Sequence, residues 1–334
     1  MSHSLESVNQ SLIPLSDRNA WISALHHVPH AFGHTWESCY ALHLTTGLDT
    51  YLYHLEDNGV HIVCPISERE YKGHIDIFTP YGFSGFISNS EYAPFPQLWE
   101  KFALDQNYVC GYFALNSILY NGNISLEGTT SDNWLYVLDL NLSLDQLYSN
   151  MSNNRKRQIK KHMVEAITLD KSILKPFFIN NFHEFFKDRE AGLFSGFSLE
   201  TLEYLVDLDH VKLIGMLKEG RVEAVSVFAY TEYVGEYLFN ISLPDGRAHT
   251  VPLLWEGVKL LKELGIPFLN LGGGLKKGDS LSDFKERFGA EKFPLSVLKQ
   301  VYNKEVFKDL CDNAGVTTHD RYFPPYRNPQ VSSN

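Results

Sequence analysis

The sequence lacks the features that mark several large classes of protein. Its four cysteines are far apart and form no CxxC pair, so a zinc knuckle or a dithiol redox motif is unsupported. No apolar run approaches the length of a membrane span, and residues 1–10 lack the apolar segment of a signal peptide. The formal net charge of −11 argues against a protein that holds nucleic acid mainly through phosphates. We expect reduced, buried thiols, no DNA partner, and a cytoplasmic location that includes peripheral attachment at the inner face of the membrane.

Hydrophobic periodicity and turn residues predict an α+β fold in two parts. In residues 1–130, two helices precede a strand meander, and Asn58-Gly59 marks a hairpin turn within it. The expected elements here are helices at 17–25, 34–43 and 96–104 and strands at 50–55, 60–66, 73–78 and 108–115. Residues 121–133 are polar and rich in turn formers, which is typical of a linker.

Residues 131–325 repeat this order at greater length, and residues 326–334 are predicted to be a polar tail. The expected strands are at 134–140, 211–217, 222–230, 234–241, 268–271 and 295–302. The expected helices begin at Ser143 and lie at 154–162, between 175 and 207, at 252–264 and at 281–288.

Three segments spread over the chain carry distinctive motifs. Thr79–Gly85 reads TPYGFSG, a loop rich in proline and glycine. Trp134–His162 reads WLYVLDLNLSLDQLYSNMSNNRKRQIKKH, a strand followed by a Leu-rich helix start and a basic block. Leu269–Glu291 reads LNLGGGLKKGDSLSDFKERFGAE, a strand that runs into glycines and then a helix.

Together with the element order, these segments resemble the FemAB-like acyltransferases of the GNAT (N-acetyltransferase) superfamily. The first is similar to their SPYGYGG loop, and the third to their D-x-G-G…FK-x-x-FG ending. The resemblance implies two tandem GNAT-like domains, at 1–130 and 131–325, with a cleft between them. It also implies acyl transfer to an amine, with a coenzyme A thioester as co-substrate and no bound cofactor.

Lys285 is the candidate catalytic residue. It lies beside Phe284 and Phe288, which are four apart and share one helix face. The resemblance implies a cationic role near the reacting carbonyl, whereas the pattern alone favours a surface helix of mixed charge.

The candidate acceptor-binding residues are cationic or lie near the predicted cleft. The basic block has no acid between residues 155 and 161, and could clamp a diphosphate, although a solvated basic helix is the alternative. The Pro- and Gly-rich loop could bring its backbone close to a ligand or could simply be a tight loop. The full set is Arg155, Arg157, Lys161, Tyr81, Gly82 and His34.

The candidate donor-binding residues lie at strand ends and at a helix start. A helix N-terminus can hold a phosphate, or Thr250 can simply cap its helix. The full set is Tyr237, Asn240, Thr250, Gly272 and Gly273. No metal site is expected, and the histidines at 26, 27, 30 and 34 are predicted to be packed or solvent-facing.

Three functions fit these residues. The first is N-acylation of an amino sugar carried on a nucleotide or lipid diphosphate, as in surface polysaccharide assembly. The second is aminoacyl-tRNA-dependent transfer to a cell-wall precursor, which an acidic chain without a coiled-coil arm disfavours. The third is a non-catalytic binding module, because residues 246–252 replace the Q/R-x-x-G-x-G/A phosphate loop of ordinary GNAT enzymes.

Overall fold

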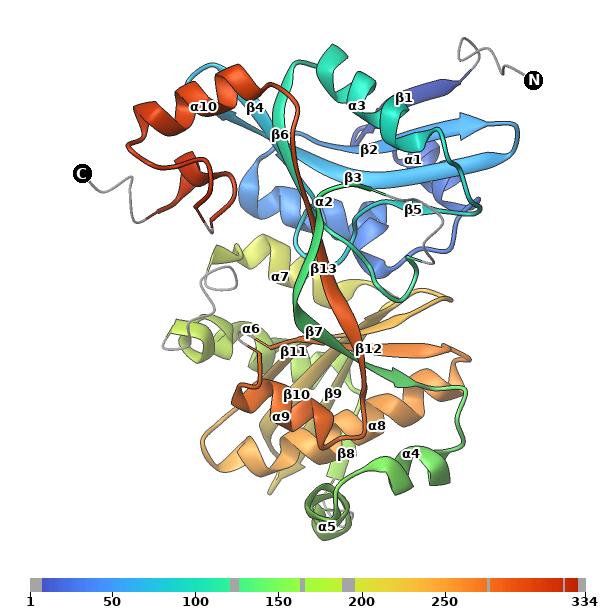
Figure 1. Cartoon of the computed structure of the whole chain (residues 1–334). Coiled ribbons are helices and arrows are strands. Elements are labelled where there is room, and N and C mark those ends of the chain that lie inside the picture. The colour runs from blue at the N-terminus through green and yellow to red at the C-terminus, as the bar shows by residue number, and fades with distance from the viewer. Residues whose placement is uncertain are drawn as a thin grey trace.

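The computed structural model describes residues 8–120, 126–162, 166–187, 196–274, 277–320 and 322–329. The described strands form one sheet, mostly antiparallel, with helices packed on it (Figure 1). The strands are β1 Asn9–Pro14, β2 Thr50–Asp57, β3 Val60–Tyr71, β4 His74–Phe78, β5 Ile87–Ser88, β6 Tyr108–Ala114, β7 Thr129–Asp139, β8 Ala166–Thr168, β9 Val211–Lys218, β10 Arg221–Tyr230, β11 Gly235–Ser242, β12 Phe268–Gly273 and β13 Glu291–Val301.

We call strands β1–β6 the first half of the sheet and strands β7–β12 the second half, with β13 between them. The helices fall into two groups, one on each half (Figure 1). The first half carries α1 Arg18–Leu25, the short η2 Phe32–His34, α2 Trp36–Thr46 and α3 Phe95–Asp105. The second half carries α4 Leu144–Asn150, α5 Asn153–His162, α6 Lys171–Lys187, α7 Leu199–Asp207, the short η4 Asp245–His249, α8 Thr250–Glu263 and α9 Ser280–Glu286. None of the described helices is both long enough and apolar enough to span a membrane.

Local sequence signals account for many of these elements. Asp17 caps α1 by accepting from the backbone N–H of Ala20, and Ser143 forms a capping box with Gln146 at α4. Asn58 and Gly59 both have positive φ, as the tight turn between β2 and β3 requires. The predicted hairpin and the α+β architecture are confirmed.

Strand β13 joins the two halves. Its residues 291–298 pair with β7, and its residues 297–301 pair with β6, so the sheet order runs β4-β6-β13-β7-β12-β11. The following helix, α10 Lys304–Asn313, packs against β6 in the first half (Figure 1). The chain therefore returns to the first half after completing the second.

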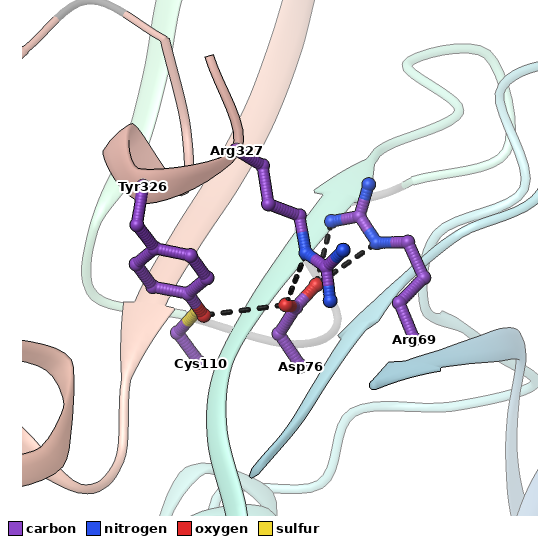
Figure 2. Close-up of polar contacts among 5 residues, drawn as sticks. All are labelled: Arg69, Asp76, Cys110, Tyr326 and Arg327. Atoms are coloured by element: carbon purple, nitrogen blue, oxygen red, sulfur yellow. Dashed lines mark hydrogen bonds and ion pairs between the residues drawn. The ribbon is translucent and has the colours of Figure 1, made fainter. Parts of the chain in front are cut away.

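A buried carboxylate fastens the end of the chain to the first half (Figure 2). Asp76 of β4 accepts hydrogen bonds from Nε and Nη2 of Arg69 at 2.9 and 2.6 Å. It also accepts from Nε of Arg327 at 2.5 Å and from the Tyr326 hydroxyl at 3.2 Å. Tyr326 and Arg327 belong to the short helix η5 Pro325–Arg327, and the Tyr326 ring is buried beside Cys110.

Several sequence-based expectations need correction. The strand β1 and the helix α10 were not predicted, and β7 begins at Thr129, inside the predicted linker. The first two residues of the predicted polar tail are held in the fold, and residues 330–334 lie outside the described residues. The boundary between residues 130 and 131 stays a prediction. All four cysteines are buried and free, as expected.

The Asp76 cluster gives a stability prediction. Asp76→Asn removes the buried charge that faces Arg69 and Arg327 and leaves two cations without their partner. We expect it to lower the free energy of unfolding by about 3 kcal/mol, the usual cost of breaking a buried ion pair. Urea denaturation measures this change. Lys308→Ala, which removes an exposed ion pair with Asp312, is the control and should have little effect. An equal effect of both substitutions would contradict the assigned role of Asp76.

Candidate functional site

Strands β11 and β12 run parallel but pair only near their starts. The register covers Gly235↔Leu269 and Glu236↔Asn270. On its other edge, β12 shifts register against β7 between Asn270 and Gly273. Strand β11 carries a bulge against β10 at Leu238, and a bulge bends its strand. The two strands therefore diverge after Glu236, and the next residues of β11 no longer pair with β12.

A pocket lies at this divergence, between the two halves. The first half contributes η2, the start of α2 and the loop after β4. The second half contributes residues around α7, the bulged part of β11 and the glycine-rich end of β12. The lining residues are Phe32, Gly33, Ser38, Leu42, Tyr81, Gly82, Phe83, Phe197, Leu205, Glu236, Tyr237, Leu238, Phe239, Asn270 and Gly272. The predicted cleft between the halves is thus present.

His34 supports the loop that lines the pocket. Its Nδ1 accepts from the Ala31 N–H at 3.2 Å, so Nε2 carries the proton and donates to the Gly85 carbonyl at 3.0 Å. Complete burial lowers the pKa of His34 to about 4, which keeps the ring neutral. Both ring nitrogens are used by the backbone, and His34 is absent from the pocket lining.

The loop itself approaches its neighbours closely. A Cβ at Gly85 would lie 2.6 Å from Cδ2 of Leu115 and 3.0 Å from the carbonyl oxygen of Ala114. Gly82 has a φ of +122°, a conformation that favours glycine. Tyr81 projects toward the second half, since its ring lies 5.9 Å from that of Phe197. The predicted acceptor residues Tyr81 and Gly82 therefore border the pocket.

Glu236 is a buried carboxylate in the pocket wall. Among the described residues, its Oε1 has no hydrogen-bond partner, and the side chain is almost inaccessible. Burial without a cationic partner raises the pKa of Glu236 to about 7. The sequence analysis missed this residue. The available signal was a single carboxylate in the mostly apolar segment 234–241.

Lys285 is buried beside the glycine-rich end of β12. Asp279 caps α9 by accepting from the N–H of Ser282, and the helix directs the Lys285 Nζ to the Gly273 carbonyl at 2.6 Å. Burial lowers the pKa of Lys285 to about 8, against an opposing effect of Asp279.

Gly272 separates the Lys285 amine from the pocket. It has a φ of +76°, and a Cβ at this position would lie 3.3 Å from Nζ of Lys285. The sequence placed Lys285 beside the helix face that Phe284 and Phe288 share. In the structure the Lys285 side chain is itself buried, with 5% exposure. Gly272 and Gly273 end β12 directly next to this amine.

Asn240 and Thr250 form a second polar group, farther along β11 than Glu236, where β11 no longer pairs with β12. Asn240 donates to Oγ of Ser226 at 2.9 Å and accepts from the Thr250 hydroxyl at 3.1 Å. Helix η4 runs directly into α8, so the N-cap of α8 is His249, which makes no side-chain cap hydrogen bond. Thr250 therefore does not cap its helix, contrary to the simpler interpretation of the sequence.

The basic block forms α5, which packs on α8 and lies outside the pocket lining. Arg155 is half-buried, with its guanidinium 4.4 Å from the Phe284 ring of α9, and it donates to Gln158. Arg157 and Lys161 are exposed. The structure thus brings Tyr81, Gly82, Tyr237 and Gly272 around one pocket, with Lys285 behind Gly272, and leaves the α5 cations outside that pocket.

Comparisons with known proteins agree with this architecture. No protein-family model matches the chain, and no curated protein matches it. Among solved structures, FemX superposes with a TM-score of 0.67 at 10% identity, over 90% of this chain and 99% of FemX. L-PGS from Bacillus licheniformis gives a TM-score of 0.55 at 15% identity, over 86% of this chain and 93% of L-PGS.

A third similar structure is a C-terminal domain from Agrobacterium fabrum, assigned to a lysylphosphatidylglycerol synthetase. Its TM-score is 0.53 at 13% identity, over 92% of this chain and 98% of that domain. At these identities the likeness concerns the fold, which is that of FemAB-like GNAT proteins.

Glu236 gives a prediction for the pH dependence of stability. Between pH 4.5 and about 7, the folded state keeps the Glu236 proton while the unfolded state has lost it. Stability contributed by this group is therefore lost as pH rises through that window. We expect wild-type protein to lose on the order of 3 kcal/mol relative to Glu236→Gln. Urea denaturation of both proteins across the window measures the difference.

The control for this prediction is Glu263→Gln, which removes an exposed carboxylate at the end of α8. The difference between wild type and Glu263→Gln should stay constant over the same window. A constant difference for Glu236→Gln as well would show that the Glu236 carboxyl is not perturbed by burial.

Proposed function

We propose that this chain, which has the FemAB-like GNAT fold, is an N-acyltransferase that moves an acyl group from a coenzyme A thioester to an amine. One observation carries the proposal: a pocket between the halves has an unpaired, buried carboxylate in its wall where β11 and β12 diverge. Acyl transfer to an amine needs a proton acceptor, stabilisation of a developing oxyanion, and exclusion of water.

Glu236 is suited to accept the proton of the attacking amine. A general base works best when its pKa lies near the operating pH, and burial brings the pKa of Glu236 to about 7. In the reaction, the amine nitrogen forms a bond to the thioester carbonyl carbon, and the carbon–sulfur bond breaks. The amine proton passes to Glu236, and coenzyme A leaves as the thiolate, which takes up a proton.

Lys285 and the free edge of β11 are suited to stabilise the oxyanion. Beyond Glu236, the backbone of β11 is released from pairing with β12, so its N–H groups can face an acyl carbonyl. The Lys285 amine lies behind Gly272 and adds positive charge in a buried setting, where a charge acts more strongly than in water. The diverging strands also leave room for a thioester to lie along β11 toward Asn240 and Thr250.

The acceptor we favour is an amino sugar carried on a nucleotide or lipid diphosphate, as in surface polysaccharide assembly. The loop at residues 81–83 and the aromatic lining provide an apolar wall on the first-half side of the pocket, with Tyr81 at its edge. Aromatic rings commonly line clefts that bind small ligands. The exposed cations of α5 could bind the phosphates of a long substrate.

A second candidate is a transferase that uses an aminoacyl-tRNA donor. Its specific support is the exposed face of α5, where Arg157, Lys160 and Lys161 present three cations on an acidic chain. Activity that disappears after RNase treatment would favour the second candidate over the first.

Donor binding is the direct test of the proposal. In isothermal titration calorimetry, acetyl-CoA and coenzyme A should both bind the full chain with a stoichiometry of one. Tyr237→Leu keeps most of the side-chain volume but changes the pocket wall, and should weaken binding roughly tenfold, which is about 1.4 kcal/mol. Tyr322→Ala removes an exposed aromatic outside the pocket and is the control. Absence of binding of both ligands would contradict an acyl-CoA donor.

Lys285 and Arg157 should affect catalysis in different ways. Lys285→Ala should lower kcat on the order of a hundredfold with little change in KM, because the charge acts chiefly in the transition state. Arg157→Ala should mainly raise the KM of a phosphate-bearing acceptor, and its effect should fade at high salt, because exposed charges are screened. Steady-state kinetics at two ionic strengths measures both effects.

Circular dichroism of the two variants controls for misfolding, which matters most for the buried Lys285. Small and equal kinetic effects in folded variants would mean that neither residue serves the reaction. Measurable acyl transfer by the wild type would at the same time exclude a purely non-catalytic binding module.

A further inference from the structure

Three metal-ligating side chains share one face of the β2–β3 hairpin, away from the pocket lining. His54 and Glu56 are two residues apart on β2, so they point to the same side of the sheet. His61 of β3 pairs directly with Glu56 and is diagonal to His54. Cross-strand partners and their diagonal neighbours are close enough for long side chains to meet.

The ligand atoms of these side chains lie close to one another. Nε2 of His54 lies 3.0 Å from Nδ1 of His61, and the nitrogen and carboxylate atoms of all three residues lie within 4.8 Å of one another. Two nitrogens that bind one zinc ion at about 2.0–2.1 Å are roughly 3 Å apart. Within the described part of the chain, this is the one group of three or more such residues whose ligand atoms lie this close together.

The surroundings hold His61 in place. The backbone N–H of His61 donates to Oδ1 of Asn89 at 2.9 Å, and the backbone carbonyl of His61 accepts from the backbone N–H of Asn89 at 3.2 Å. The ring of His27, just after α1, stacks on His61 with centroids 4.1 Å apart and an interplanar angle of 9°. Fixed ligands of this kind reduce the cost of ordering on metal binding.

The rest of this face is a packed core. Leu52 and Val63 lie on it and contact Trp21 and Leu25 of α1 in one buried cluster. The three ligand residues lie at the edge of that cluster, where Glu56 is exposed, His54 is half-buried and His61 is buried. An ion could therefore reach the site from solvent while binding to ligands that the fold positions.

We propose that His54, Glu56 and His61 form a binding site for a divalent transition-metal ion of the zinc class. Two imidazoles and one carboxylate are a donor set that suits zinc, cobalt or nickel better than magnesium or calcium. Three protein ligands leave at least one coordination position for water or another small donor. The ion would tie β2 to β3 near the hairpin turn and would stabilise the first half. This site is independent of the proposed acyl transfer.

Cobalt(II) titration of the full chain tests the site, because tetrahedral cobalt with nitrogen and oxygen ligands absorbs visible light. After dialysis against a chelator, the wild type should bind one equivalent of cobalt, and zinc should displace it. His54→Gln and His61→Gln should weaken binding by at least about 100-fold, since even a partner behind a ligand is worth 10–100-fold. His74→Gln, which changes an exposed histidine on β4, is the matched control and should bind normally.

Glu56→Gln guards against variants that fail to fold, because its side chain is exposed and its removal should leave the hairpin intact. It should also weaken cobalt binding and abolish the rise in Tm that zinc gives the wild type. Lack of stoichiometric binding by the wild type would overturn the proposal and leave His54 and His61 as a hydrogen-bonded pair. Binding that all three variants retain would overturn it too, because the ion would then be held elsewhere.

Discussion

The position of β13 between β6 and β7 is the constraint on which the rest of the structure depends. Without it, the two halves would share only the chain connection and side-chain contacts. With it, strand pairing continues from the first half to the second through β6, β13, β7, β12 and β11. The Gly85 N–H donates to the Ala114 carbonyl at the end of β6, so the pocket loop is anchored to the same ladder. Glu236 lies at the other end of that ladder. The loop and Glu236 are therefore both held by the same sheet.

Burial has opposite consequences for the two ionisable groups at this site. It raises the pKa of Glu236 to about 7 and lowers the pKa of Lys285 to about 8, because desolvation disfavours the charged form of either group. The two values approach each other from ordinary values that are far apart. At neutral pH, Glu236 can therefore gain or lose a proton at small cost, while Lys285 is still largely charged. A proton acceptor and a cation therefore lie near one buried pocket, as the acyl transfer proposed above would need.

The sequence predicted the elements that local patterns determine and missed those that depend on distant partners. The Asn58-Gly59 turn and the amphipathic α8 carry their own signals, and the motifs of the loop at 79–85 and around Lys285 indicated the fold. Helix α10 also carries local signals, the Asn303 cap and an apolar face that buries Phe307 and Leu310, and the sequence analysis overlooked them. The pairing of β13 with two strands cannot be read from its own residues.

The same distinction explains the candidate site. Tyr81, Gly82 and Gly272 lie in sequence motifs, Tyr237 lies in a predicted strand, and all four line one pocket. Their roles in binding stay predictions. Glu236 was missed because a single carboxylate in a mostly apolar strand forms no recognisable motif. Its position in the pocket wall results from the bulge in β11 and from the divergence of β11 and β12. His34 was associated with the cleft, but its two nitrogens bind backbone groups, so its effect on the pocket passes through the Gly85 loop.

The basic helix α5 shows how a run of like charges divides between structure and surface. Of its five cations, Arg155 stacks on Phe284 and Lys156 donates to the Ser149 carbonyl, so both contribute to packing. Arg157, Lys160 and Lys161 remain exposed, and on a helix Arg157 and Lys161 share one face. Two cations on one face can hold a phosphate group. At ordinary salt, dissolved ions screen the attraction of such exposed charges beyond about 10 Å. The Arg155 contact with Phe284 ties α5 to α9, which carries Lys285, but none of the α5 cations lines the pocket. The exposed cations of α5 are therefore a feature of the surface, separate from the buried groups that line the pocket.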